Sequence, residues 1–132
     1  MAMLKYVLVI KILFTAFCWA VPALAAPRWV FERLGFPERY PDLFIRLLGA
    51  AYLALLVGYL FAVQELCRGV YPAATVWVGV VSNGLACTIL AVAAIRRSWL
   101  TWGLPARTLM WASLGMTFLI TASLLWFGPL GH

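Results

Sequence analysis

Charged side chains are scarce in this sequence, and their scarcity excludes an ordinary water-soluble domain. Only 11% of the 132 residues are charged, and 66% are hydrophobic. A soluble domain averages about 25% charged and about 45–50% apolar residues. A soluble chain of this size also leaves a large share of its surface in water, so it cannot bury this much apolar surface. The composition therefore predicts a membrane protein.

Residues that carry metal, haem or hydrolytic chemistry are also missing. The only histidine is His132, the last residue, which excludes haem ligation by two helical histidines within this chain. The cysteines Cys18, Cys67 and Cys87 form no CxxC or other metal-ligand spacing. Neither a Ser-His-acid set nor a glycine-rich phosphate loop can be assembled. We therefore expect no cofactor, no metal and no catalytic residue. A redox enzyme that uses Cys67, beside Arg68, stays open as an alternative.

Four long apolar runs are present, and each is long enough to cross a bilayer as a helix. A helical span needs roughly 20 residues, and none of the runs alternates as a barrel strand does. The runs cover residues 6–26, 43–66, 73–95 and 107–127. The predicted fold is all-α: an integral membrane four-helix bundle that forms a single transmembrane domain over residues 1–132.

Two short stretches resemble each other at a distance of half the chain. Residues 48–53 read LGAAYL and residues 114–119 read LGMTFL. A duplication would make the bundle two parallel-related helical hairpins, an arrangement that some transporters use. Chance similarity between apolar segments is the other interpretation.

The connections between the runs carry aromatic and charged residues together. Residues 27–42, PRWVFERLGFPERYPD, interleave the two kinds up to the GFP at 35–37, which favours a short helix lying in the membrane interface. Trp99 and Trp102 in the third connection are typical of aromatic residues at headgroup level.

The first run has some features of a signal peptide. A lysine precedes an apolar stretch, and Ala-Leu-Ala stands at residues 23–25, as at a cleavage site. Lys11 interrupts the run, however, and Pro27 with the Trp-containing continuation is typical of an interfacial anchor. We therefore expect the segment to be kept as the first helix.

Basic residues collect in connections 1 and 3, which sets the expected orientation. The net charge of +6 lies in short connections, so we expect contact with anionic lipid headgroups rather than with nucleic acid. The candidate headgroup ligands are Arg28, Arg46, Arg96 and Arg97. By the positive-inside rule, connections 1 and 3 would be cytoplasmic and both termini outside. Lys5 and Lys11 near the N-terminus argue against this orientation. Arg46 could instead pair with Asp42.

Small and polar residues recur along the apolar runs at helical spacing. In the third run Thr75, Gly79, Asn83, Cys87 and Ala91 stand every four residues, and Ala50, Ala54, Gly58 and Ala62 do so in the second. Such stripes let membrane helices pack closely. The alternative is a polar cavity at mid-membrane depth that binds a ligand, with Asn83, Ser82, Thr117 and Thr121 as its candidate residues.

Lys11 and Glu65 are the candidates for an ion pair. Antiparallel first and second helices would bring Lys11 and Glu65 to the same membrane face, and charges in membranes commonly pair. Alternatively, Lys11 extends its ammonium to the interface and Glu65 is already in water.

Part of the chain resembles a known group of membrane proteins. The stretches are FPERYPDLFIRLLGAAYLALLVGYLFA and VWVGVVSNG, and the similarity covers about residues 15–95. They resemble the small bacterial four-helix membrane proteins of the DoxX-like group. The resemblance implies the architecture and an association with membrane partners of redox and sulfur-metabolism proteins. It implies no set of catalytic residues.

These observations leave two main functional hypotheses. The first is a non-catalytic accessory or partner subunit of a membrane complex, in contact with the lipid bilayer and with another membrane protein or itself. The second is a small transporter or binder of a hydrophobic molecule such as a quinone or lipid.

Overall fold

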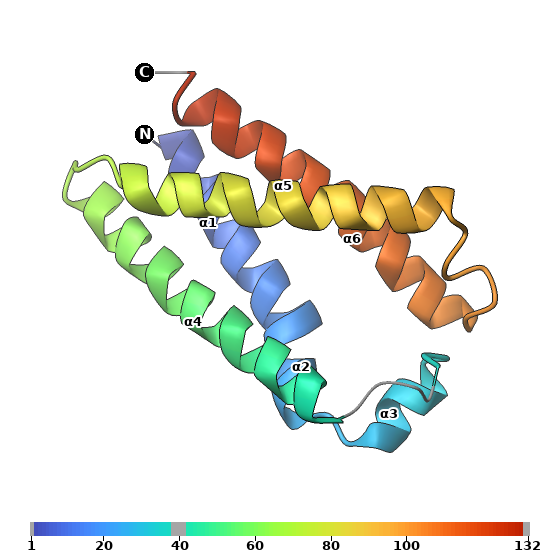
Figure 1. Cartoon of the computed structure of the whole chain (residues 1–132). Coiled ribbons are helices and arrows are strands. Elements are labelled where there is room, and N and C mark those ends of the chain that lie inside the picture. The colour runs from blue at the N-terminus through green and yellow to red at the C-terminus, as the bar shows by residue number, and fades with distance from the viewer. Residues whose placement is uncertain (1, 38–41, 131–132) are drawn as a thin grey trace.

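The computed structural model describes residues 2–37 and 42–130, which fold into helices joined by short connections (Figure 1). No strand occurs in these two ranges. His132 and Arg39 lie outside them. The elements are α1 (Ala2–Thr15), the π-helix η1 (Ala16–Ala20), α2 (Val21–Ala25), α3 (Arg28–Arg33), α4 (Asp42–Cys67), α5 (Ala73–Ile95) and α6 (Leu104–Phe127).

The all-helical bundle predicted from the composition is confirmed. By length and composition, four helices in the described ranges could cross a membrane: Ala2–Ala25, Ile45–Cys67, Ala73–Ile95 and Leu104–Phe127. The first begins a turn before the predicted residue 6, and the last begins at Leu104 rather than residue 107. Pro105 lies in the first turn of α6, where its missing N–H is not needed and its fixed φ favours the helix.

The first apolar helix is continuous from α1 through η1 to α2, but it contains one wide turn. Pro22 has no N–H to donate, so it cannot continue the regular bonding of an α-helix. Immediately before it, the backbone N–H of Val21 donates to Ala16 O, five residues earlier. This π turn restores the bonding around the proline. It shifts the register of the side chains that follow.

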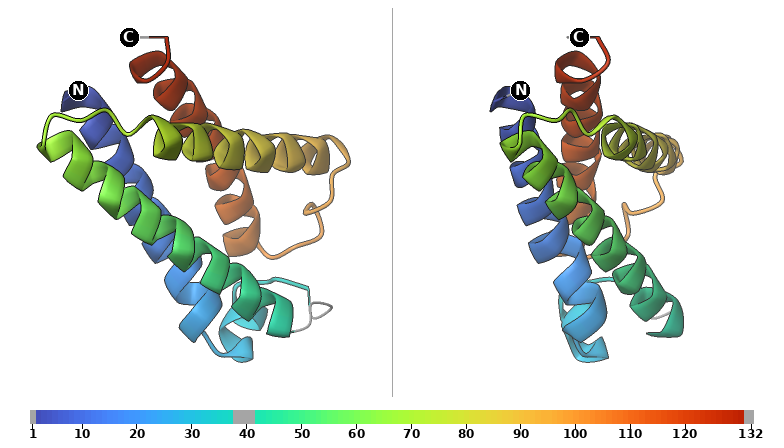
Figure 2. Two further views of the ribbon diagram at one scale, coloured as in Figure 1. Left: turned by 60° about the vertical axis from the view of Figure 1, so that its left-hand side comes forward. Right: turned by 90° about the vertical axis from the view of Figure 1, so that its left-hand side faces the viewer.

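The core forms where α1 lies between α4 and α6. Its fully buried side chains include Leu4 and Leu8 of α1, Tyr59 of α4, Val76 of α5 and Leu124 of α6. The most extensive contact joins α5 and α6, whereas α4 and α5 touch little although they are consecutive. In both figures α5 crosses the other long helices steeply (Figures 1 and 2). This crossing leaves a wedge between α4 and α5.

The predicted interfacial segment forms the short helix α3 and then docks on the start of α6. Its chain turns at Gly35, whose φ is +85°. The amide of Gly103 donates to Gly35 O over 3.0 Å, and the amide of Ala106 donates to Leu34 O over 3.0 Å. These bonds satisfy amides at the N-terminal end of α6 that have no partner within the helix. Connections 1 and 3 therefore lie side by side at one end of the bundle.

Arg46, a candidate headgroup ligand, makes hydrogen bonds within the protein. Its guanidinium donates to two backbone carbonyls at the end of α2, Ala23 O at 2.8 Å and Ala26 O at 2.7 Å. Carbonyls in the last turn of a helix have no partner within it, and a guanidinium suits the negative end of the helix dipole. Arg46 thus joins α4 to α2, and its contact with lipid phosphate stays a prediction.

Trp99, predicted to lie at headgroup level, packs inside the protein. It is only 3% exposed, and its ring meets that of Trp111 edge-on, with centroids 5.6 Å apart. Trp102 is half-buried and packs on Phe36, with ring centroids 5.5 Å apart. The pair Trp99 and Trp111 ties the third connection to α6.

Candidate functional site

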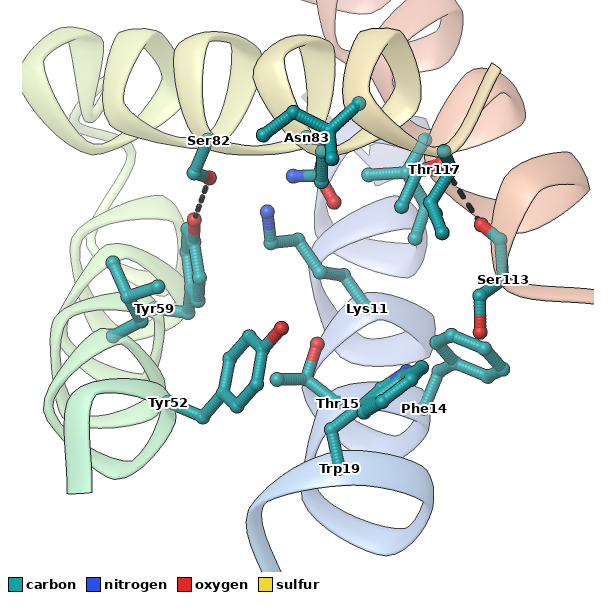
Figure 3. A pocket seen from close by; sticks show the side chains of 15 residues that line it. Lys11, Phe14, Thr15, Trp19, Tyr52, Tyr59, Ser82, Asn83, Ser113 and Thr117 are labelled. Carbon is teal, nitrogen blue, oxygen red and sulfur yellow. Dashed lines mark hydrogen bonds between the residues drawn. The ribbon is translucent and has the colours of Figure 1, made fainter. Parts of the chain in front are cut away.

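Side chains of the four long helices line a cavity of about 270 Å³ (Figure 3). Residues from all four contribute to its wall. The side chains that bear polar groups are Lys11, Thr15, Tyr52, Tyr59, Ser82, Asn83, Ser113 and Thr117. Phe14, Trp19, Leu55 and Ile120 supply much of the apolar lining. Ile89 lies at the rim and is 67% exposed, so the cavity approaches the outer surface of the bundle there.

Helical spacing places these side chains on the faces that meet. Lys11, Thr15 and Trp19 stand four residues apart on the first helix, and Tyr52 and Tyr59 stand seven apart on α4, so each set shares one face. The sequence analysis did not assign these residues to a cavity. Within each helix, the spacing alone indicates that these residues share a face. Which faces meet depends on how the helices cross.

Lys11 lies deep inside the bundle. Its side chain is only 3% exposed, and it is nine residues from the start and fourteen from the end of the helix Ala2–Ala25. These separations correspond to roughly 13 and 21 Å along the helix. The amino nitrogen lies 4.2 Å from the centroid of the Tyr59 ring. Figure 3 shows it pointing toward Ser82 and Asn83. The amino group of Lys11 therefore lies near mid-span rather than at an interface.

Gly79 allows this approach. A Cβ atom at Gly79 would lie 3.6 Å from the Lys11 nitrogen and only 2.8 Å from Leu124 Cδ1. A larger residue would therefore meet both α1 and α6. The glycine leaves room beside α5 for the amino group of Lys11 and the side chain of Leu124.

Polar side chains of α4 and α5 lie beside the lysine. The hydroxyls of Tyr59 and Ser82 are 3.3 Å apart and share a hydrogen bond. Ser82 also donates to Gly79 O over 3.2 Å, and the Asn83 amide donates to the same carbonyl over 2.6 Å. The structure thus brings Ser82 and Asn83 to the cavity wall, with their donors directed at their own helix.

Of the two predicted cavity residues on α6, one lines the cavity and the other does not. Thr117 lines the cavity and donates to Ser113 O over 2.8 Å. Thr121 does not line it; its hydroxyl donates to Thr117 O over 2.7 Å, and its methyl group faces Gly84. Ser113, which was not a candidate, lines the cavity at 1% exposure, and its hydroxyl has no hydrogen-bond partner within the described residues.

The structure does not bring Lys11 and Glu65 together. Glu65 is exposed near the end of α4, whereas Lys11 lies over Tyr59, which is six residues earlier in α4. Six residues correspond to about 9 Å along a helix. In the described ranges the ion pair that forms is Arg28 with Glu32, at 3.3 Å.

The other candidate headgroup ligands lie in connections 1 and 3. Arg28 is exposed and engages Glu32, one turn later in α3. Arg96 and Arg97 are exposed beyond the end of α5, and Arg97 has a φ of +55°. Arg28, Arg96 and Arg97 therefore lie at the surface of the protein, and their contact with anionic lipid stays a prediction.

A second cavity of about 390 Å³ lies at this end, between α2, α3, α4 and the start of α6. Its lining is almost wholly apolar and includes Cys18, Phe31, Phe36, Leu48 and Met110. Arg28 and Glu32, the charged residues that line it, already pair with each other. It contains none of the predicted ligand-binding residues. The three cysteines are free, and the described residues contain no group of three His, Cys, Asp or Glu that could hold a metal ion.

The Lys11 cavity is energetically demanding. A lysine at the centre of a membrane helix costs about 2.5–3.5 kcal/mol on insertion scales. A cation–π contact returns about 0.5–2 kcal/mol. The contact with Tyr59 therefore does not offset the full cost of a charged lysine. No ion pair between Lys11 and an acidic residue forms among the described residues. Ionisable residues inside a membrane-spanning helix usually serve a function.

Comparisons with protein families, curated proteins and solved structures found no match to this chain. The resemblance to the DoxX-like group therefore stays a prediction from the sequence.

Proposed function

We propose that this chain is a multi-pass membrane protein that binds a small, largely apolar molecule in the Lys11 cavity. The observation that carries the proposal is a buried lysine beside an open space with aromatic walls. Ligand sites combine such apolar linings with a few fixed polar groups. The cavity also contains the unpartnered hydroxyl of Ser113. Binding within the bundle agrees with the second of the two sequence hypotheses.

Filling the cavity tests the proposal. Ala86 lines it from α5, so Ala86→Phe should place a ring in the space and displace any occupant. The purified protein in lipid nanodiscs is dialysed against tritiated menadione, 2-naphthamide or 2-naphthoate, with empty nanodiscs subtracted. We expect saturable one-to-one binding of at least one probe, lowered at least about tenfold by Ala86→Phe.

The matched control is Ala112→Phe, at an exposed position of α6 outside the cavity lining. This variant should bind as the parent does. Saturable binding of none of the three probes, or equal binding by Ala86→Phe and the parent, would remove the proposal.

A role as a partner subunit is the second candidate, and a separate groove favours it. Ala54 and Gly58 of α4 face Ala74 and Thr75 of α5 across an open space of about 610 Å³. A Cβ at Gly58 would meet nothing within 4 Å. Small residues of this kind admit a neighbouring membrane helix, either from another protein or from a second copy. Gly58→Phe should release a stoichiometric partner during mild detergent purification; recovery of only the isolated chain from native membranes would oppose this role.

The proposed setting is a bacterial inner membrane, with connections 1 and 3 in the cytoplasm and both termini outside. Arg28, Arg33, Arg96 and Arg97 support it, because all four lie in these two connections, which hydrogen bonds join near the start of α6. Lys11 lies near mid-span, so it no longer weighs against this orientation. Reporter fusions at each terminus measure it: an active cytoplasmic reporter at either end would reverse the assignment.

A further inference from the structure

We propose that the occupant of the Lys11 cavity is a small aromatic monocarboxylate, bound with its carboxylate at the lysine and its ring among the aromatic side chains. This inference rests on the proposed function and specifies its ligand class. Two observations support it: the lysine at one point of the cavity, and the aromatic walls and volume of the rest of the cavity.

The charge requirement comes from the surroundings of Lys11. Its nitrogen meets the Tyr59 ring and points toward the neutral side chains of Ser82 and Asn83 (Figure 3). The described glutamates are elsewhere: Glu32 pairs with Arg28, and Glu65 is exposed. A buried cation is favourable only with a compensating partner. A carboxylate would supply that partner and make the occupied cavity neutral overall, whereas a quinone would leave the positive charge uncompensated.

The body of the ligand is constrained by the walls and the volume. Phe14, Trp19 and Tyr52 offer ring faces and edges, which favour another ring in an offset or edge-on arrangement. A cavity of about 150 Å³ accepts one benzene ring. The observed volume of about 270 Å³ therefore has room for two fused rings and a carboxylate.

The orientation follows from the position of the polar groups. The Lys11 nitrogen points toward α5, while Figure 3 shows the Ser113 hydroxyl beside Phe14, away from that nitrogen. The carboxylate would lie beneath Ser82 and Asn83. The ring would extend toward Phe14 and Trp19. Ser113 would then offer its unpartnered hydroxyl to a polar substituent on the ring.

The test compares two probes that differ mainly in charge. Tritiated 2-naphthoate and 2-naphthamide share the same ring system, and their binding to the full chain in nanodiscs is measured by equilibrium dialysis. We expect naphthoate to bind at least about tenfold more tightly than naphthamide. Lys11→Met should lower naphthoate affinity at least about tenfold and leave naphthamide affinity unchanged. Lys5→Met, at an exposed position of the same helix, should change neither.

The outcomes separate this inference from the function on which it rests. Equal affinity for the two probes, or naphthoate binding that survives Lys11→Met, overturns the carboxylate assignment. Binding of menadione or naphthamide without naphthoate, abolished by Ala86→Phe, also overturns it but leaves the proposed function intact. Failure of all three probes to bind removes both. The affinities of naphthamide and naphthoate are compared on the parent protein. This part of the test therefore does not depend on whether a variant folds.

Discussion

Lys11→Met should stabilise the protein while it abolishes carboxylate binding. The methionine has a similar length and is apolar, so the change removes the cost of a buried, uncompensated ammonium with little loss of packing. The cost at mid-membrane exceeds the return from the Tyr59 ring. We expect the free energy of unfolding to rise by about 1–2 kcal/mol. Reversible unfolding in mixed detergent, monitored by tryptophan fluorescence, measures the change.

Lys5→Met is the control, because Lys5 lies on α1 but is exposed. It should leave the free energy of unfolding nearly unchanged. If Lys11→Met instead destabilised the protein clearly more than the control does, Lys11 would be part of the structural framework. A stability gain accompanied by lost binding is the pattern of a residue kept for function at the expense of stability.

Gly35→Ala should destabilise the protein strongly by detaching connection 1 from α6. Gly35 has a φ of +85°, and an added Cβ would lie 2.4 Å from Gly103 Cα. This overlap cannot relax easily, because the opposing atoms of Gly103 belong to the backbone. A residue with a side chain costs about 1–2 kcal/mol in the left-handed region, and the overlap adds about 1–3 kcal/mol. We expect a loss of about 2–5 kcal/mol in the free energy of unfolding.

Gly58→Ala provides the comparison for that substitution. Gly58 is in the middle of α4, and a Cβ there would meet nothing within 4 Å. Replacing an unobstructed helical glycine by alanine gains about 0.5–1 kcal/mol. The two variants should thus shift the denaturation midpoint in opposite directions. A Gly35→Ala protein as stable as Gly58→Ala would show that the turn does not rest on Gly103.

The helices could be read from the sequence because their cause is local. Each apolar run is long enough to span a membrane, and its backbone must bond internally in that medium. The same locality explains why Ser82, Asn83 and Thr117 were found as cavity candidates: each shows a polar group at a helical position within an apolar run. Thr121 carries the same signal, but it lies one turn farther along α6 and faces Gly84.

Other parts of the site depend on how the helices meet, which no single run specifies. The Lys11 nitrogen lies over the Tyr59 ring, and Gly79 of α5 leaves room for it because it has no side chain. A sequence-based pairing with Glu65 assumed only antiparallel neighbours and ignored how the helices meet. Similarly, Arg46 binds the carbonyls of Ala23 and Ala26 because α2 ends beside the start of α4. These contacts join distant segments and have no periodicity within either one.

The joint between Arg46 and α2 bears on proteolytic maturation. The Ala-Leu-Ala sequence that resembles a processing site is helical, and Ala23 is buried against α4, where Gly49 lies close to it. A peptidase would have to unwind this turn and displace the guanidinium before it reached the scissile amide. Cutting after Ala25 would also discard Lys11 and one wall of the cavity. The mass of the chain isolated from cells therefore reports directly whether the binding chamber exists in the mature molecule.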